Sequence, residues 1–310
     1  MPRKTLIPAP LKPGDLIGIA APASPFERAA FDRGVDAIRR KGYPVRIPEG
    51  VFRDSGFLAG TDRQRADILN SLFADPQVKA ILCARGGYGS LRVLPHLDYD
   101  SVRSRPKHVA GFSDITFLLN ALYSECGLAG LLSPLVTTLD GEESSDALFS
   151  ALAGNGPECI RAESGAVISP GKAAGVVLGG NLTCLCHMIG TPWQPDLRRR
   201  ILILEDIGEM PYRLDRMLTQ MRLAGCLEGL AGVALGGFDD TGVIAGPLME
   251  VFQDAFADLG IPVVTGFPVG HGRRNLTVPI GRKAVLDAES MSLCWSSPPK
   301  GWSGSSGSPP

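Results

Sequence analysis

Short apolar runs alternate with amphipathic stretches through the first half of the chain. Helical spacing of apolar positions follows most of these runs, and the runs themselves are short enough to be buried strands. The expected strands are 15–21, 43–47, 78–84 and 108–112, and the expected helices are 26–40, 61–73 and 114–125. Thr61 is expected to cap the second helix. Repeated strand–helix units predict an α/β fold whose parallel sheet has helices on both faces.

The second half has the same signals with more strand than helix. The expected strands are 174–178, 200–204, 233–238, 263–267 and 283–286, and the expected helix is 213–224. Between 140 and 171 the pattern decays into segments rich in Gly, Ser and Pro, which favours a domain boundary there.

This pattern predicts two domains. We expect an N-terminal α/β domain over 1–155, a linker over 156–171 and a C-terminal domain over 172–295. Residues 296–310 are mostly Ser, Gly and Pro, so we expect a disordered tail.

The charge balance restricts the partners of the protein. Its 31 basic and 32 acidic residues give a net charge of -1, which argues against nucleic acid or an anionic membrane surface. No apolar run approaches the roughly 18 residues needed to span a bilayer, and the N-terminus is a poor signal peptide. We therefore expect a cytoplasmic protein.

The cysteines give no sign of a metal or redox centre. There are seven of them and no CxxC pair, so neither a zinc site nor a redox dithiol is expected. We interpret all seven as small buried hydrophobic residues. No other cluster of metal ligands stands out, and we expect no cofactor.

Ser113 is the first candidate for chemistry. It follows an expected strand that ends at Phe112 and precedes an expected helix, which is the geometry of a nucleophile elbow. The amide of Asp114, at the helix N-terminus, could face a developing oxyanion. Ile115 stands where a G-x-S-x-G motif has its second glycine, so the alternative is that Ser113 or Asp114 merely caps the helix.

A glycine-rich segment, Arg85-Gly86-Gly87-Tyr88-Gly89, follows another expected strand. It lacks the sequence of a phosphate-binding P-loop and fails the spacing of a dinucleotide motif. Glycines at such a place let the backbone approach a ligand and present its N–H groups. The amide of Gly87 is thus a candidate second oxyanion donor, with a simple tight turn as the alternative.

Glu205 and His271 are the candidate partners of the serine. Glu205 ends an apolar strand, where its carboxylate could orient a histidine. Asp206, Glu209 and Asp215 compete for that role, and an exposed acidic turn is the alternative.

His271 lies between two glycines in an expected loop, whereas His96, His108 and His187 have structural surroundings. Its imidazole could take and return a proton near neutral pH, although a solvated loop histidine remains open. The order Ser, acid, His matches one of the known arrangements of a catalytic triad.

Several of these segments together resemble the LD-carboxypeptidase family of serine peptidases, which also includes microcin-immunity amidases. The matching blocks cover nearly the whole chain except its C-terminal tail. They are 11–15, 84–89, 111–114, 178–182, 204–216 and 270–271. Ser133-Pro134 departs from the Gly-Pro of many members, which bears on substrate preference.

The resemblance implies a flavodoxin-like N-terminal layer and a smaller, β-rich C-terminal domain with the active site between them. It implies Ser113 as nucleophile, His271 as general base and Glu205 as its orienting residue. The amides of Gly87 and Asp114 would form the oxyanion hole.

The family activity implied is release of terminal D-alanine from cytoplasmic murein tetrapeptides by a homodimeric enzyme. Arg85 is a candidate for the substrate carboxylate, and Gly180 and Asn181, in a matching block, for further substrate contacts. Two alternatives stay open, an amidase of aminoacyl-nucleotide substrates and a non-catalytic peptide-binding protein.

Overall fold

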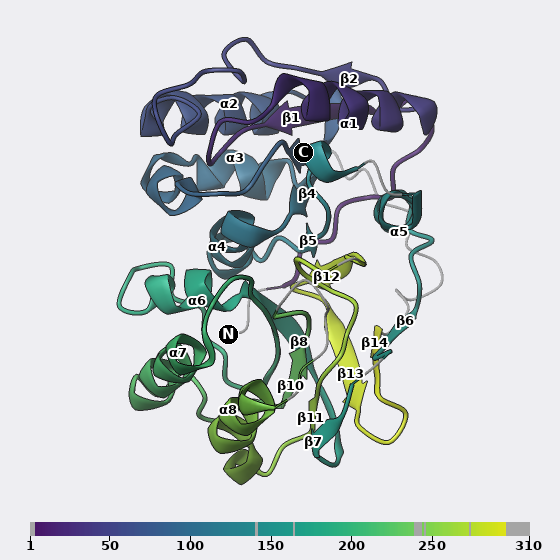
Figure 1. The fold of residues 1–310 in the computed structure, drawn as a ribbon. Coiled ribbons are helices and arrows are strands. Elements are labelled where there is room, and N and C mark those ends of the chain that lie inside the picture. Colours follow the sequence, from purple (N-terminus) through teal and green to yellow (C-terminus); the bar gives the residue numbers. More distant parts are fainter. Residues whose placement is uncertain are drawn as a thin grey trace, which may run out of the picture.

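The protein contains two β-sheets that lie one above the other with their helices (Figure 1). A computed structural model describes residues 4–139, 142–163, 165–238, 244, 246–272 and 274–295. The expected tail over 296–310 therefore lies outside the described residues.

The first sheet is flavodoxin-like. Its strands are β1 (Leu16–Ala20), β2 (Val45–Arg46), β3 (Val78–Cys83), β4 (His108–Gly111), β5 (Gly130–Leu132) and β12 (Val278–Ile280). They follow the order β12-β5-β4-β3-β1-β2, with β1 to β5 parallel and β12 antiparallel to β5. The order 2-1-3-4-5 is that of flavodoxin-like doubly wound folds, which confirms the expected fold class.

Helices cover both faces of this sheet. They are α1 (Arg28–Arg40), α2 (Asp62–Ala74), α3 (Tyr99–Ser104), α4 (Thr116–Cys126) and α5 (Glu142–Leu152). Along β3, Ala80 and Leu82 belong to the core that includes α1 and α5, whereas Ile81 and Cys83 belong to the core that includes α2, α3 and α4. This alternation explains why β3 is apolar on both faces.

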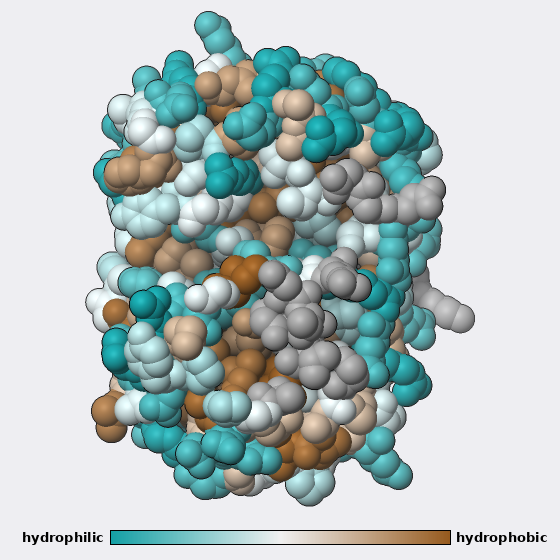
Figure 2. Space-filling model, viewed as in Figure 1, coloured by the Kyte–Doolittle hydropathy of each residue, from teal (hydrophilic) through white to brown (hydrophobic). Residues whose placement is uncertain are grey.

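Helix α2 begins where the sequence predicts. The Thr61 hydroxyl accepts a hydrogen bond from the amide of Gln64, whose side chain accepts one from the amide of Thr61. This reciprocal arrangement is a capping box. Figure 2 shows mostly hydrophilic residues over the α1 and α2 end of the molecule, as solvated faces of amphipathic helices require.

The second sheet is mixed. Its strands are β6 (Cys159–Arg161), β7 (Val167–Ser169), β8 (Lys172–Asn181), β9 (Arg200–Glu205), β10 (Gly232–Leu235), β11 (Val263–Val264), β13 (Lys283–Asp287) and β14 (Ser292–Trp295). They follow the order β6-β14-β13-β8-β9-β10-β11-β7. Strands β8 to β11 are parallel, and the outer strands are antiparallel.

Three helices accompany this sheet, α6 (Leu182–Met188), α7 (Pro211–Leu223) and α8 (Pro247–Phe256). Among the described residues, the short 3-10 helices are η1 (Ser90–His96), η2 (Ser113–Ile115), η3 (Val136–Thr138) and η4 (Ala257–Leu259).

The segment between the two halves has more structure than its sequence predicts. Helix α5 and strands β6 and β7 lie in the range where the hydrophobic pattern decays. Each strand has three residues and pairs at an edge of the second sheet, which is too short for alternation to be visible. The division into domains at 1–155 and 172–295 stays a prediction.

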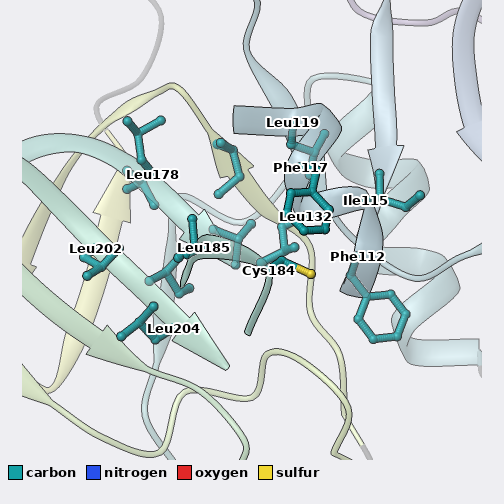
Figure 3. Packing of buried hydrophobic residues seen from close by; sticks show 14 of the residues in the cluster. Phe112, Ile115, Phe117, Leu119, Leu132, Leu178, Cys184, Leu185, Leu202 and Leu204 are labelled. Atoms are coloured by element: carbon teal, nitrogen blue, oxygen red, sulfur yellow. The ribbon is translucent and has the colours of Figure 1, made fainter. Parts of the chain in front are cut away.

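A single hydrophobic cluster joins the two halves. Figure 3 shows Phe117 and Leu132 from the first half next to Cys184 from the second, with Leu178 and Leu185 farther along the same cluster. Burial of such side chains is the main stabilising contribution between packed layers. The ends of β4 and β9 are therefore fixed relative to each other by packing.

The expectation that all seven cysteines are small buried hydrophobic residues is wrong. Cys159 and Cys294 form a disulfide between the neighbouring strands β6 and β14, and Cys159 is exposed. Cys83, Cys126, Cys184 and Cys186 are free and buried, as expected, and Cys226 is free and partly exposed. Sequence could not pair residues 135 positions apart, because only the strand register brings them together.

Candidate active site

Ser113 lies at the turn between β4 and the helices η2 and α4. Its backbone has a φ of 62°, in the left-handed region that a residue with a side chain rarely adopts. Such strain is concentrated at functional sites and is typical of the nucleophile elbow. The observed geometry therefore has the form that the sequence predicts for this segment.

The glycine-rich loop after β3 passes directly against Ser113. A Cβ atom placed on Gly86 would lie 3.1 Å from Ser113 Oγ, and Gly87 has a φ of 98°. Residues with larger side chains could not make this approach. The backbone of the loop is thus beside the hydroxyl, where N–H groups could contact a substrate.

The carboxylate of Asp114 fastens this loop, a contact that the sequence does not reveal. It accepts hydrogen bonds from the amide of Gly89 (3.3 Å) and the amide of Ser90 (2.7 Å). Burial raises the pKa of the Asp114 carboxyl, and the bonds from Ser90 and Gly89 oppose that rise. Asp114 follows Ser113 in the chain, and its side chain therefore ties the serine turn to the glycine-rich loop.

Glu205 and His271 are hydrogen-bonded to each other. Glu205 ends β9 and is completely buried, and its Oε2 lies 2.6 Å from Nδ1 of His271. Burial opposes protonation of the imidazole, but the hydrogen bond and the charge of Glu205 and the charge of Asp206 outweigh it. The pKa of His271 is consequently raised above its usual value.

Phe112 brings the histidine to the serine turn. Its ring contacts the His271 imidazole with centroids 4.7 Å apart, and it directly precedes Ser113 in the chain. Three segments that are remote in sequence therefore meet at the end of β4. Figure 3 shows Phe112 at the edge of the shared cluster.

Two of the three competing acids, Asp206 and Glu209, have other partners. Asp206 accepts hydrogen bonds from the side chain of Asn181 (3.0 Å) and from the amide and hydroxyl of Thr183 (2.8 Å each). Glu209 pairs with Arg213. In the described part of the chain, Glu205 is the carboxylate that contacts His271.

Two other histidines have structural contacts, as expected. His108 is hydrogen-bonded to the carbonyl of Ala9, and His187 to the carbonyl of Thr183. Neither contact involves the Ser113 turn.

The residues proposed for substrate binding have protein partners. Arg85 is exposed, and its guanidinium donates to the carbonyl of Pro25. Gly180 and Asn181 end β8, and the Asn181 side chain caps α6 by accepting from the amide of Cys184. Their roles toward a substrate stay predictions.

Two further polar residues support the site and have no distinctive sequence signal. The hydroxyl of Ser24 accepts from the amide of Tyr88 (3.1 Å), and Asn275 accepts from the amide of Gly270 (3.1 Å). Both act on loop backbones, so only the tertiary contacts identify them.

No group of three or more His, Cys, Asp or Glu side chains suited to a metal ion occurs within the described ranges. Within the same ranges, no helix is both long and apolar enough to cross a membrane.

Two models of known protein families match this chain. The model of the LD-carboxypeptidase N-terminal domain matches residues 17–133, and that of the C-terminal domain matches residues 174–286. The chain belongs to the LD-carboxypeptidase family, and so to the carboxypeptidase class of hydrolases.

Individual relatives agree with this family. A putative carboxypeptidase of Synechocystis is 42% identical over 94% of this chain and 98% of its own length. A probable murein peptide carboxypeptidase of Bacillus subtilis is 35% identical over 90% of this chain and 91% of its own. The microcin C7 self-immunity protein MccF of Escherichia coli is 28% identical over 93% of this chain and 95% of its own.

Solved structures have the same architecture. MccF bound to glutamyl sulfamoyl guanosine superimposes with a TM-score of 0.85 at 26% identity, over 93% of this chain and 98% of that chain. A muramoyltetrapeptide carboxypeptidase from Oxalobacter formigenes gives a TM-score of 0.78 at 28% identity, over 90% of this chain and 97% of that chain.

Proposed function

We propose that the protein is a serine LD-carboxypeptidase in which Ser113, His271 and Glu205 form the catalytic triad. The observation that carries the proposal is the 2.6 Å contact between His271 Nδ1 and Glu205 Oε2 at the end of β9. It leaves Nε2 as the imidazole nitrogen available to a hydroxyl, as a triad needs. The strained backbone of Ser113 and its neighbour Phe112, packed on His271, support the same assignment.

The proposed reaction proceeds through an acyl-enzyme. Ser113 Oγ attacks the scissile carbonyl carbon while His271 Nε2 takes the hydroxyl proton. The C–N bond then breaks, and His271 gives that proton to the leaving amine. In the second half a water attacks the ester carbon, its proton passes through His271, and Ser113 Oγ leaves with a proton restored.

Backbone amides would stabilise the negative charge that develops on the carbonyl oxygen. We assign this role to the N–H groups of Gly87 and Asp114, because the glycine-rich loop passes beside Ser113 and Asp114 is the second residue of the helical turn that begins at Ser113. Preorganised donors of this kind typically contribute a factor of about 10² to 10³ in kcat.

The substrate that we propose is a murein tetrapeptide, from which the enzyme would release terminal D-alanine. Relatives with printed names of murein peptide and murein tetrapeptide carboxypeptidases support this choice. We assign Arg85 to the terminal carboxylate and Gly180 and Asn181 to further substrate contacts. We also propose a cytoplasmic location and a homodimer, the latter measurable by light scattering.

Incubation with a murein tetrapeptide tests the proposal. We expect tripeptide plus D-alanine by mass spectrometry from the wild type, and loss of at least about 10³-fold in kcat for Ser113→Ala. Cys226→Ser, a change at a free cysteine away from the triad, should keep wild-type activity. Full activity of Ser113→Ala would refute the assignment.

A second candidate is an amidase of aminoacyl-nucleotide substrates. The superposition with MccF bound to glutamyl sulfamoyl guanosine favours it. A side-by-side assay of a murein tetrapeptide and an aminoacyl sulfamoyl nucleoside separates the two activities by their kcat/KM. A serine-directed phosphonate separates both from a peptide-binding protein, which would leave Ser113 unlabelled.

A further inference from the structure

Two exposed aromatic side chains lie next to each other near the serine turn. Phe57 is 62% exposed and Tyr88 is 53% exposed. Their rings meet edge to face, with centroids 5.5 Å apart. Apolar surface that is gathered in one place on a protein commonly marks a binding site, whereas single exposed side chains do not.

The backbones of both aromatic residues are hydrogen-bonded to the same serine. The hydroxyl of Ser24 donates to the carbonyl of Phe57 (2.9 Å) and accepts from the amide of Tyr88 (3.1 Å). Arg92, near the Tyr88 side chain, is paired with Asp62. The bonds from Ser24 fix the backbone that carries each ring, which limits the conformational entropy lost on binding.

Tyr88 of the Phe57–Tyr88 pair lies on the loop that passes Ser113, where the scissile bond would be attacked. Gly86 passes against Ser113, Gly87 carries the proposed oxyanion donor, and Tyr88 is the next residue in the chain. The Phe57–Tyr88 pair therefore adjoins the loop that carries the proposed oxyanion donor.

We propose that Phe57 and Tyr88 form a subsite for the aliphatic carbon chain of the residue that precedes the scissile amide. The rings offer apolar surface on which the methylene groups of a side chain can pack. This proposal rests on the proposed function, because Ser113 sets where the carbonyl lies.

A series of substrates that differ only in this chain tests the subsite. Peptides ending in D-alanine would carry alanine, aminobutyrate, norvaline or norleucine before the scissile bond. In the wild type we expect kcat/KM to rise by up to about fourfold for each added methylene. In Phe57→Ala/Tyr88→Ala the rise should fall to below about 1.5-fold.

Leu223→Ala is the matched control. Leu223 is a large hydrophobic residue on α7 that is 83% exposed, and its removal should leave the dependence on chain length unchanged. A flat series in the wild type, or an undiminished rise in the double variant, would overturn the subsite while leaving the carboxypeptidase proposal intact.

Binding by Ser113→Ala makes the test independent of turnover. Calorimetry with the same peptides should give affinities that rise with chain length and lose that rise when Phe57 and Tyr88 are also replaced. This result would support the subsite even if no peptide were hydrolysed. No peptide binding, or affinity that responds only to an aromatic base in a nucleoside amide, would overturn it.

Discussion

At the scale of single residues, His271 experiences opposing influences on its pKa. Burial lowers the pKa of His271, whereas the hydrogen bond and charge of Glu205 and the charge of Asp206 raise it. The raising contributions together exceed the effect of burial, so the net shift of the pKa is upward. A general base must be neutral, and a raised pKa moves the pH at which it becomes neutral upward. The raised pKa also affects the stability of the fold. The stabilisation that comes from protonated His271 is fully present below the pKa that His271 has in the unfolded chain, and it is lost as the pH rises through the pKa of the folded protein.

The pH profile of kcat/KM should show this shift. We expect its acidic limb to lie above about 6.5, the usual histidine pKa. In Glu205→Gln the limb should move to lower pH and kcat should fall by about 10²- to 10⁴-fold, because the neutral amide stabilises the imidazolium less. Glu209→Gln is the control, since Glu209 pairs with Arg213 instead. An acidic limb at the same pH in Glu205→Gln would contradict the role of Glu205.

Sequence reasoning at this scale identified side chains but few of their contacts. Ser113, Glu205 and His271 each follow a strand or stand between glycines, and that local pattern is visible in the chain. The bond between Asp114 and the glycine-rich loop, and the bonds of Ser24, connect residues more than 20 positions apart. No local pattern reports such contacts.

At the scale of elements, one arginine connects the His271 loop to the segment between the two halves. Arg274 donates from Nε to Glu143 on α5 (2.9 Å) and also pairs with Glu163, which follows β6. The three side chains are partly exposed, so each pair should contribute about 0.2–1 kcal/mol. Together they restrain the loop that presents His271.

Arg274→Gln should therefore lower kcat by about two- to tenfold with little change in KM. Wild-type kcat should fall toward the variant's value between 0.05 and 0.5 M salt, because salt screens exposed pairs, and the variant should not respond. Arg198→Gln, which breaks an exposed pair with Asp196, is the control. Equal kcat for Arg274→Gln and wild type at low salt would show that the pairs do not position His271.

Elements with a clear hydrophobic period were predicted, and the short edge strands β6, β7 and β12 were not. The helix beginning after Thr61 and the buried strand β3 follow the expected ranges closely. Strand β12 has three residues, and its pairing with β5 returns the C-terminal half to the first sheet. Such pairing depends on the position of distant segments rather than on local propensity.

At the scale of the whole molecule, the disulfide closes a long section of the chain. It joins Cys159 to Cys294 across 135 positions, so it reduces the conformational freedom of the unfolded state. Bonds of this kind typically stabilise a fold by about 2–4 kcal/mol.

The oxidised protein should therefore resist urea better than Cys159→Ser/Cys294→Ser, by about 2–4 kcal/mol in the free energy of unfolding. Reductant should remove this advantage from the wild type and leave the double variant unchanged. Cys226→Ser, at a free thiol, should unfold like the wild type. Identical midpoints for oxidised and reduced wild type would contradict a stabilising bond.

The disulfide also bears on the proposed location. Cytoplasmic thiols are mostly kept reduced, so a cytoplasmic enzyme would carry this pair as free thiols until it met an oxidising environment. Alkylation of thiols in intact cells, followed by mass spectrometry, distinguishes the two states.

The sequence by itself determined the fold class, because strand and helix periods are local properties of the chain, and it determined which side chains could carry chemistry. Only the tertiary structure decided that Glu205 meets His271, that Phe112 brings both to Ser113, and that Cys159 meets Cys294. These contacts follow from strand register and from the packing of one shared core, and both are properties of the whole folded chain.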